Sequence, residues 1–144
     1  MTEQNFSNHG RLVPAYHFFV FFVFVINLGW TVYKLIQTRF SLDSIVSLLV
    51  AAALLVLFFY ARIFPLTAQD RIIRLEERLR FERLLPADLK PRIGEFTLDQ
   101  LISLRFASDA ELGELARAVL NEKLTDRKAI KQRVKNWKAD YLRV

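Results

Sequence analysis

Two long stretches of this sequence contain no Asp, Glu, Lys or Arg: residues 12–33 and residues 44–61. A soluble domain interleaves charged and apolar residues with a helical or strand period. Each of these stretches is instead apolar on every face of a helix, and a helix needs about 20 such residues to cross the hydrocarbon core of a membrane. The sequence therefore predicts an integral membrane protein.

The two stretches predict two transmembrane helices, at about residues 14–35 and 43–64. Few residues separate these helices, so we expect an antiparallel hairpin. Ser41 or Asp43 is expected to cap the second helix, and Pro65 is expected to limit its continuation. The first stretch is longer than the about 7–15 apolar residues of a cleavable signal peptide, and a second span follows it. We therefore expect the first helix to be retained.

Basic residues near the ends of the spans predict the orientation, because Lys and Arg are enriched in cytoplasmic loops. The connection between the spans offers Lys34 and Arg39. Six arginines lie at the exit of the second span or after it: Arg62, Arg71, Arg74, Arg78, Arg80 and Arg83. The sequence therefore predicts that the part after the second span is cytoplasmic. With two spans, both termini are then expected on the cytoplasmic side.

The part after the second span carries most of the charge and predicts helices. Residues 69–85 predict an amphipathic helix with an apolar stripe of Ile72, Leu75 and Leu79. The Arg and Glu residues between them have the spacing of a solvated helix surface.

Two capping boxes, in which a hydroxyl and an acid or amide three residues later bond to free N–H groups, predict two further helix starts. They are Thr97-Leu-Asp-Gln100 and Ser108-Asp-Ala-Glu111. The helix after Ser108 is expected to pack through one apolar side, which consists of Leu112, Leu115, Ala116 and Val119. A last helix is expected from about residue 125, with an apolar stripe of Ile130, Val134, Trp137 and Tyr141.

These patterns predict an all-α membrane protein in which a two-helix transmembrane hairpin is followed by a small helical cytoplasmic domain. The expected parts are a polar N-terminal segment at 1–13, the hairpin at 14–65 and the helical domain at 66–144. The last helix of that domain is expected to be basic and amphipathic.

The first span offers two kinds of contact residue. Asn27 lies near its middle, where an amide seeks a hydrogen-bond partner on another helix. Gly29 and the small residues of the second span permit close approach of helices, and those small residues are Ala51, Ala52 and Ala53. The many Phe side chains of the first span are expected to contact lipid or the second span, more than a pigment or quinone.

His9 and His17 are the two histidines of the chain. A metal site needs three or four convergent ligands, which the sequence does not offer, so we predict no metal. His17 at the membrane interface is expected to bond to headgroups or backbone. The alternative is a single axial ligand to a haem in a larger complex. The chain also contains no cysteine, which excludes disulfides and thiolate chemistry.

The end of the chain is strongly basic. Residues 123–144 carry a net charge of +6, equal to that of the whole chain. On the cytoplasmic side, each basic residue near an anionic lipid surface contributes about 1 kcal/mol of attraction. The side chains expected to contact the membrane surface or a partner are Lys128, Lys131, Lys135, Trp137 and Lys138.

Four short motifs resemble a family of small bacterial proteins of unknown function with two predicted transmembrane helices. The motifs are Gln4-Asn5-Phe6-x-Asn8-His9-x-Arg11, Pro14-x-Tyr16-His17, Leu104-Arg-Phe-Ala-Ser-Asp109 and Trp137-x-x-Asp140-x-x-Arg143. The resemblance covers nearly the whole chain. It implies a location in the bacterial inner membrane, and it implies no activity, substrate or site.

Together these features predict a non-enzymatic membrane anchor, scaffold or accessory subunit, with no catalytic residues and no cofactor. Its expected partners are the lipid bilayer and either other membrane subunits or further copies of itself. One alternative is a membrane-tethered regulator whose basic helix binds nucleic acid, although we do not expect nucleic acid as a partner. The other is a cofactor-carrying subunit that uses His17.

Overall fold

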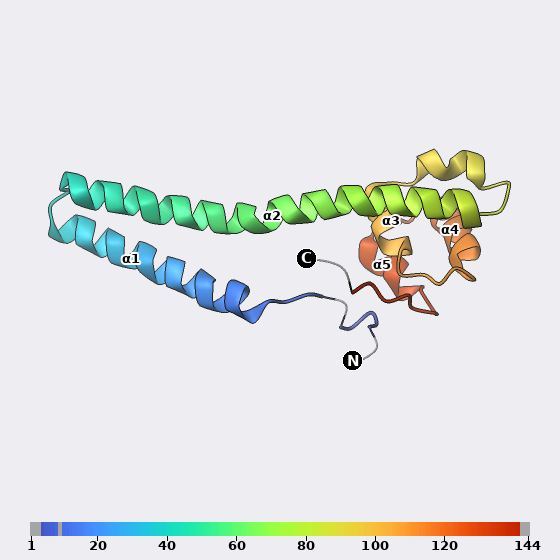
Figure 1. Cartoon of the computed structure of the whole chain (residues 1–144), viewed down its shortest axis with the longest axis horizontal. Coiled ribbons are helices and arrows are strands. Elements are labelled where there is room, and N and C mark those ends of the chain that lie inside the picture. Colours follow the sequence, from blue (N-terminus) through green and yellow to red (C-terminus); the bar gives the residue numbers. More distant parts are fainter. Residues whose placement is uncertain (1–3, 9, 142–144) are drawn as a thin grey trace. The chain divides into compact units, whose positions relative to one another are not determined.

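The computed structural model describes residues 4–8 and 10–141, and the regular elements of these residues are helices (Figure 1). In chain order they are the π-helix η1 (Ala15–Val20), α1 (Phe21–Gln37), α2 (Leu42–Leu84), the 3-10 helix η2 (Lys90–Glu95), α3 (Leu98–Leu104), α4 (Leu112–Asn121) and α5 (Arg127–Gln132). The expected all-helical class is thereby confirmed.

The chain forms two compact units. We call Arg11–Leu66 the apolar unit; Met1–Gly10 and Thr67–Val144 together form the charged unit. By length and composition, the helix over Ala15–Gln37 and the helix α2 could each cross a membrane.

Helix α2 is continuous for 43 residues and contains Pro65. The prediction that Pro65 limits this helix is wrong. A proline inside a helix costs about 3 kcal/mol, because it lacks an N–H group and crowds the preceding turn. The nearest buried residues of α2 are Phe58 and Ile73, one in each unit, and the helix continues between them.

In the apolar unit, η1, α1 and the first half of α2 contact each other through aromatic side chains. The ring of Tyr16 stacks on that of Phe58 with the centroids 4.4 Å apart, and its hydroxyl donates a hydrogen bond to the carbonyl oxygen of Phe58. Thr31 and Ser44 are buried, and Ala51 is only 1% exposed. At the start of α2, the hydroxyl of Ser41 accepts a hydrogen bond from the Ser44 N–H at 3.4 Å. Ser41 is therefore the cap of this helix.

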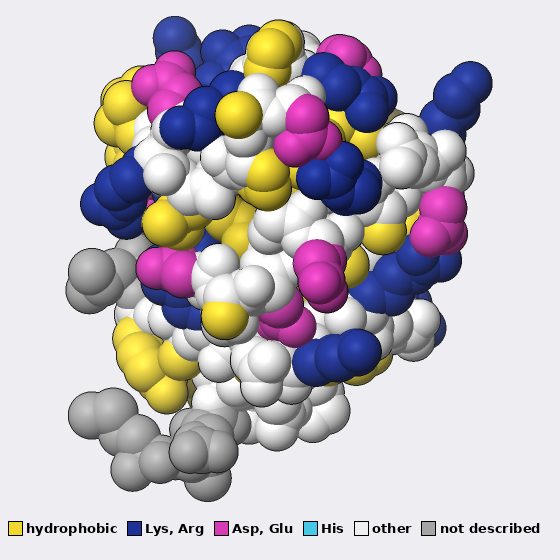
Figure 2. Space-filling model, turned by 90° about the vertical axis from the view of Figure 1, so that its right-hand side faces the viewer, with side chains coloured by type: hydrophobic (Ala, Val, Ile, Leu, Met, Phe, Trp, Pro, Cys, Tyr) yellow, Lys and Arg dark blue, Asp and Glu magenta, His cyan; other side chains and the backbone are white. Residues whose placement is uncertain are grey.

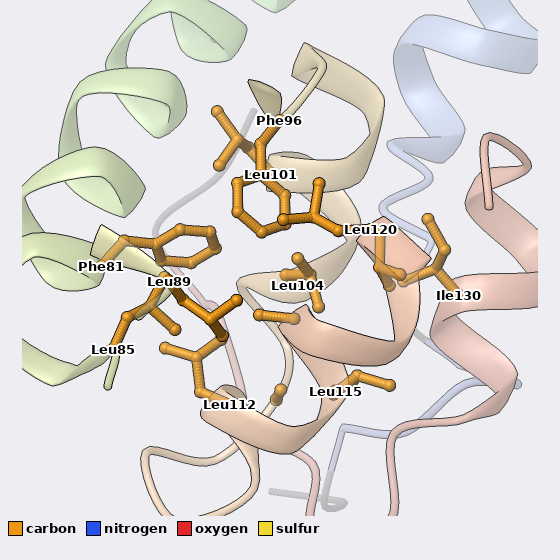
Figure 3. Close-up of a cluster of buried hydrophobic side chains, with 13 residues drawn as sticks. Phe81, Leu85, Leu89, Phe96, Leu101, Leu104, Leu112, Leu115, Leu120 and Ile130 are labelled. Carbon is orange, nitrogen blue, oxygen red and sulfur yellow. The ribbon is translucent and has the colours of Figure 1, made fainter. Parts of the chain in front are cut away.

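The charged unit has one hydrophobic core, to which α2, α3, α4 and α5 all contribute (Figure 3). Its largest fully buried side chains include Phe81, Leu101, Leu104, Leu112 and Ile130. Both hydrogen bonds of the predicted Thr97–Gln100 capping box are present at the start of α3. The expected packed side of α4 is also confirmed, because all four of its predicted residues are buried. The predicted helix start at Ser108 is wrong, because α4 begins at Leu112 without a side-chain cap, and the Ser108 N–H donates to Oε1 of Glu111 at 3.2 Å in the turn before it.

The side of α2 that packs against this core differs from the predicted stripe. Ile73, Glu77, Arg80 and Phe81 are buried, whereas Ile72, Leu75 and Leu79 are exposed. The interpretation of the charged residues of this helix as a solvated surface is therefore wrong for Glu77 and Arg80. These two are buried because the loop after α3 supplies hydrogen-bond partners for Arg80, and a single sequence does not show such tertiary contacts.

The last helix begins close to its predicted start, at Arg127, but it is much shorter than predicted. Helix α5 ends at Gln132, and residues 135–138 instead run beside the loop that follows α3, with a β-bridge between Ala107 and Trp137. The Ser108 N–H donates to the Asn136 carbonyl at 3.0 Å, and the Lys138 N–H donates to the Phe106 carbonyl at 2.7 Å. These backbone hydrogen bonds compete with helix formation in this segment.

Candidate functional site

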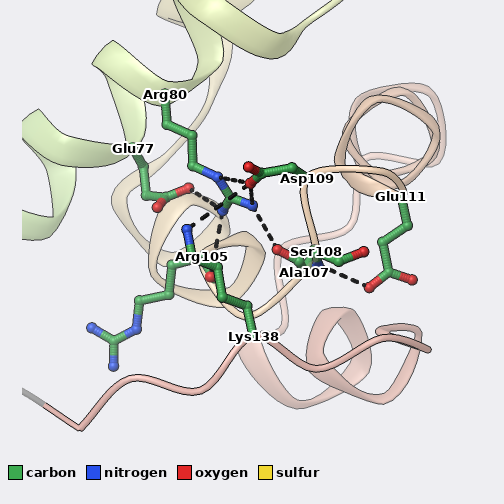
Figure 4. A network of polar contacts seen from close by, with 8 residues as sticks. All are labelled: Glu77, Arg80, Arg105, Ala107, Ser108, Asp109, Glu111 and Lys138. Atoms are coloured by element: carbon green, nitrogen blue, oxygen red, sulfur yellow. Dashed lines mark hydrogen bonds and ion pairs between the residues drawn. The ribbon is translucent and has the colours of Figure 1, made fainter.

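A cluster of charged side chains surrounds Arg80 on the buried side of α2 (Figure 4). The Nε and Nη2 atoms of Arg80 donate to Oδ1 of Asp109 at 2.9 and 2.6 Å. Nη2 also donates to the Ala107 carbonyl at 2.7 Å, and Nη1 donates to Oε2 of Glu77 at 3.2 Å. Arg80 is 6% exposed. Because a buried guanidinium is costly unless its N–H groups have acceptors, this set of bonds offsets the cost of burying Arg80.

Glu77 is the most deeply buried acid of the cluster, at 7% exposure. Burial raises the pKa of Glu77 above its ordinary value, and the opposing attraction of Arg80 is the smaller effect. The pKa of Asp109 is lowered instead, chiefly because its carboxylate accepts hydrogen bonds from Arg80. The pKa values of the two carboxyl groups that contact Arg80 are therefore shifted in opposite directions.

Next to this cluster, Phe106 is covered by three side chains. Trp137 stacks on its ring with the centroids 4.5 Å apart. The Nζ atom of Lys131 lies 5.2 Å from the centroid of the ring, and Cζ of Arg105 lies 4.6 Å from it. Lys131 and Trp137, two of the predicted membrane or partner contacts, thus take part in the packing of this domain.

The N-terminal segment and the C-terminal segment meet at Asp140. The side-chain amide of Gln4 accepts a hydrogen bond from the Asp140 N–H at 2.7 Å and donates one to the Asp140 carbonyl at 3.1 Å. The carboxylate of Asp140 lies 3.4 Å from Nη1 of Arg105. Gln4, Arg105 and Asp140 belong to three of the motifs that carry the family resemblance. The charged unit therefore brings together residues that are far apart in the sequence.

Two open hollows lie beside Lys138. One has a volume of about 330 Å³ and is lined by Ile73, Glu76, Glu77, Arg105, Lys138, Ala139, Asp140 and Tyr141. The other, of about 380 Å³, is lined by Glu76, Glu77, Leu79, Arg80, Arg83 and Lys138. Carboxylates and cations line both hollows together with apolar side chains.

Several basic side chains of the C-terminal segment have acidic neighbours within the charged unit. Arg127 pairs with Asp99, Arg133 lies 2.7 Å from Glu122, and Nζ of Lys138 lies 3.9 Å from Asp109. Lys128 and Lys135 are exposed. On the face seen in Figure 2, basic and acidic side chains are mixed rather than gathered by sign. The structure therefore leaves less uncompensated basic surface than the sequence suggests.

The predicted helix-packing residues fall into two groups. Ala51 is buried and Asn27 is half-buried. Gly29, Ala52 and Ala53 are exposed, and a Cβ atom added to Gly29 would meet no atom within 4 Å. Those three positions take no part in the packing of the apolar unit.

His17 has a local hydrogen-bond partner in the backbone. Its Nδ1 atom lies 3.1 Å from the N–H nitrogen and 2.9 Å from the carbonyl oxygen of Val13, one turn earlier in the chain. This contact matches the backbone bonding expected of an interfacial histidine. His9 lies outside the described residues, as does Arg143. Among the residues that the structure describes, no group of three or more His, Asp or Glu side chains could hold a metal ion.

The Phe side chains near the start of the chain point in two directions. Phe21 and Phe24 contact Phe58, with centroids 5.7 and 6.2 Å away. Phe18, Phe19 and Phe22 instead line a shallow apolar hollow of about 650 Å³ on the outer side of η1 and α1. Only apolar residues line it, so no polar side chain is there to orient a cofactor.

Sequence reasoning missed the Arg80 cluster, although the sequence carried a signal for it. Ile73, Phe81 and Leu85 recur at spacings of eight and four and so share a helix face. Glu77 lies on the same face, midway between Ile73 and Phe81, and Arg80 adjoins Phe81. An ion pair within an apolar face is a sign of burial. The contact of Arg80 with Asp109 could not be predicted from the sequence, because the two residues are 29 positions apart.

The polar contacts of the charged unit form a structural clamp around Arg80, which Asp109, Ala107 and Glu77 hold in place. Neither a curated protein nor a solved structure matches the chain. The match to a protein family, in contrast, extends over residues 1–144. The chain belongs to DUF6526, a family of unknown function.

Proposed function

We propose that this protein is a non-enzymatic anchor, scaffold or accessory subunit of a bacterial inner membrane. The observation that carries the proposal is the distribution of side chains in the apolar unit. Its small polar residues Thr31 and Ser44 are buried, whereas large apolar side chains such as Phe19 face outward, with 70% of that residue exposed. A protein in water shows the opposite distribution.

Energetics supports lipid as the surroundings of this unit. Its outward side chains include Phe18, Phe22, Ile26, Ile36, Leu49, Leu57 and Phe64, each more than half exposed. Full burial of one such side chain is worth about 1.5–3 kcal/mol relative to water. Monomeric soluble proteins seldom expose contiguous apolar patches larger than a few hundred Å². In a bilayer the outward side chains contact lipid, so none of them has the free-energy cost of exposure to water.

In this proposal η1, α1 and the first half of α2 form an antiparallel hairpin, with spans at about 14–35 and 43–64. The excess of Arg after the second span directs the charged unit to the cytoplasm, and both termini are on that side. The hairpin packs on transmembrane helices of other subunits or of further copies. Gly29, Ala52 and Ala53 suit such contacts, because they are exposed and small.

The charged unit is then the part that binds a partner or the anionic membrane surface. Its own core and the Arg80 clamp keep it folded, while Lys128 and Lys135 remain exposed. The nucleic-acid alternative depended on a long basic helix, and residues 133–141 are not helical. The anchor or scaffold function is therefore the one that the geometry supports best.

The test is purification of the tagged full chain from native membranes in mild detergent, followed by mass spectrometry of the subunits that purify with it. We expect the chain in the membrane fraction, together with a stoichiometric membrane partner or with itself. A hairpin variant in which both Leu49 and Leu57 are replaced by Asp serves as the control for insertion, since charge at these outward positions is costly in lipid. Recovery of the wild-type chain from the soluble fraction would contradict the proposal.

A further inference from the structure

Outside the proposed spans, α2 has a second apolar side that the fold leaves uncovered. Ile72, Leu75 and Leu79 are 57%, 61% and 58% exposed. Their spacing of three and four residues places them in one row along the helix. We call these three residues the outer stripe.

The outer stripe is distinct from the face that α2 uses in its own core. That core face contains Ile73, Phe81 and Leu85, all of them buried. Positions three and four apart with large apolar side chains are the a and d positions of a coiled coil. Upstream, the same alternation of four and three residues reaches Ala68 and then Pro65, so the row of large apolar side chains begins at Ile72. The outer stripe therefore has the pattern of a helix–helix seam that lacks its second helix.

We propose that the outer stripe binds the outer stripe of a second copy of this chain, as a parallel two-stranded pair of α2 helices. This inference rests on the proposed membrane anchoring, because two copies inserted in the same direction present their α2 helices parallel. Three side chains form a small contact for a dimer in solution. Two helices held in one bilayer meet at a high effective concentration, so a small contact suffices there.

Charged residues beside the stripe favour the second copy as the occupant. In a parallel pair, the residue before one a position lies opposite the residue five places later in the partner helix. Here those residues are Arg71 and Glu76. Both are exposed, and neither has a hydrogen bond or ion pair among the described residues. A parallel pair would form this Arg–Glu contact twice, once on each side of the seam.

The charges also indicate where the seam ends. The next pair of this kind joins Arg78 of one copy to Arg83 of the other, which is a contact of like charge. Glu82 occupies the next core position, and α2 ends at Leu84. The pairing is thus confined to the turns between Arg71 and Leu79, directly after the proposed membrane span.

Disulfide cross-linking in native membranes tests this inference directly, because the chain has no cysteine of its own. In the full chain, Leu75→Cys places one thiol in the seam. Arg74→Cys is the matched control, since it is also exposed and points about 100° away around the helix. On mild oxidation, we expect at least tenfold more covalent dimer from Leu75→Cys than from Arg74→Cys. Equal yields would overturn the inference, as would a Leu75→Cys disulfide to a protein of another mass.

A charge exchange tests the parallel register separately. In the Leu75→Cys background, Arg71→Glu alone and Glu76→Arg alone each place like charges in contact, so each should reduce the dimer yield several-fold. The double variant restores opposite charges and should restore the yield. A double variant that stays as low as the single variants would overturn the parallel register.

Failure of this inference and failure of the proposed function give different results in the same sample. Alkaline carbonate extraction of the membranes reports whether the chain is inserted. A chain released by carbonate would contradict the anchor itself. A chain that resists carbonate but forms no Leu75→Cys dimer would overturn the outer-stripe pairing alone.

Discussion

Arg80 illustrates how a buried cation is held inside a small helical domain. Its guanidinium donates to a carboxylate of the loop after α3, to a backbone carbonyl and to Glu77. Burial of a charge is favourable only when such partners are complete, and the removal of one partner leaves the others uncompensated. A large share of the stability of the charged unit should therefore depend on this one side chain.

We predict that Arg80→Ala lowers the free energy of unfolding of the charged unit by about 3–5 kcal/mol, because Glu77 would remain buried without its cation. Arg83→Ala is the matched control, since Arg83 is exposed on the same helix. It should change the free energy by less than about 0.5 kcal/mol. Hydrogen exchange of the amides of α3 and α4 in the full chain, in detergent, measures both. Equal protection in the two variants would contradict a clamp at Arg80.

The pKa of Glu77 leads to a second prediction, about pH. Burial raises this pKa in the folded state above its ordinary value of 4.5, so the folded protein holds the proton more tightly than the unfolded chain does. The stabilisation that results is complete below pH 4.5 and is lost as the pH rises through the folded pKa. Between pH 4.5 and 7, the free energy of unfolding should fall more in the wild type than in Glu77→Gln.

Asp109→Asn is the control, because the contribution of Asp109 to the free energy of unfolding changes with pH in the opposite direction. Its carboxyl pKa is lowered below 3.8 by the hydrogen bonds from Arg80, so its contribution is present above pH 3.8 and is lost as the pH falls. Urea unfolding at a series of pH values measures both variants. Parallel pH profiles for wild type and Glu77→Gln would show that Glu77 does not titrate in this window.

At the scale of the element, the end of α4 has the hydrogen bonds of a Schellman motif. The Leu124 N–H donates to the Val119 carbonyl at 3.0 Å, and the Lys123 N–H donates to the Leu120 carbonyl at 3.3 Å. This motif places Lys123 in the left-handed region, with a φ of 51°. Glycine is the residue usually found there, because it has no Cβ to clash with the backbone.

We therefore predict that Lys123→Gly stabilises the charged unit by about 0.5–1 kcal/mol. A side chain in the left-handed region costs roughly 1–2 kcal/mol, and the substitution removes this cost. The net gain is smaller because glycine loses more backbone entropy on folding than lysine does. The same substitution within α5, Lys128→Gly, should destabilise the unit by about 1 kcal/mol. The urea midpoints of the two variants should move in opposite directions. A lower midpoint for Lys123→Gly would contradict the account of this helix end.

The elements that the sequence predicted well are those fixed by local chemistry. The capping box at Thr97 and the apolar side of α4 depend on residues three or four apart, and both are present. The end of the chain was misread because Trp137 and Tyr141 have a helical spacing by coincidence. The structure instead pairs residues 136 and 138 with the backbone of residues 106–108. A contact across about 30 residues leaves no periodic trace in one sequence.

The candidate site was less predictable than the fold for the same reason. In the sequence, Arg80, Asp109 and Asp140 look like ordinary surface charges, and only the fold brings Arg80 to Asp109 and Arg105 to Asp140. The family resemblance pointed to the segments that contain Gln4, Arg105 and Asp140, but not to their contacts. Pro65 shows the converse case, because a strong local signal for a helix end is present and α2 nevertheless continues through it.

At the scale of the whole molecule, composition divides the chain as the compact units do. The apolar unit, Arg11–Leu66, has charged side chains only near its ends and at the connection around Arg39. The charged unit combines a hydrophobic core with an exposed charged surface. In the proposed function, the apolar unit anchors the protein in the membrane and the charged unit binds a partner or the membrane surface.

The central claim, a two-span anchor with both termini in the cytoplasm, is tested most directly by labelling single cysteines with a membrane-impermeant maleimide. The chain contains no native cysteine, so Ser7→Cys, Gln37→Cys and Lys128→Cys each report one position. In intact cells, we predict labelling at position 37 alone, with positions 7 and 128 labelled only after the inner membrane is opened. Labelling of positions 37 and 128 from the same side of the membrane would contradict the account.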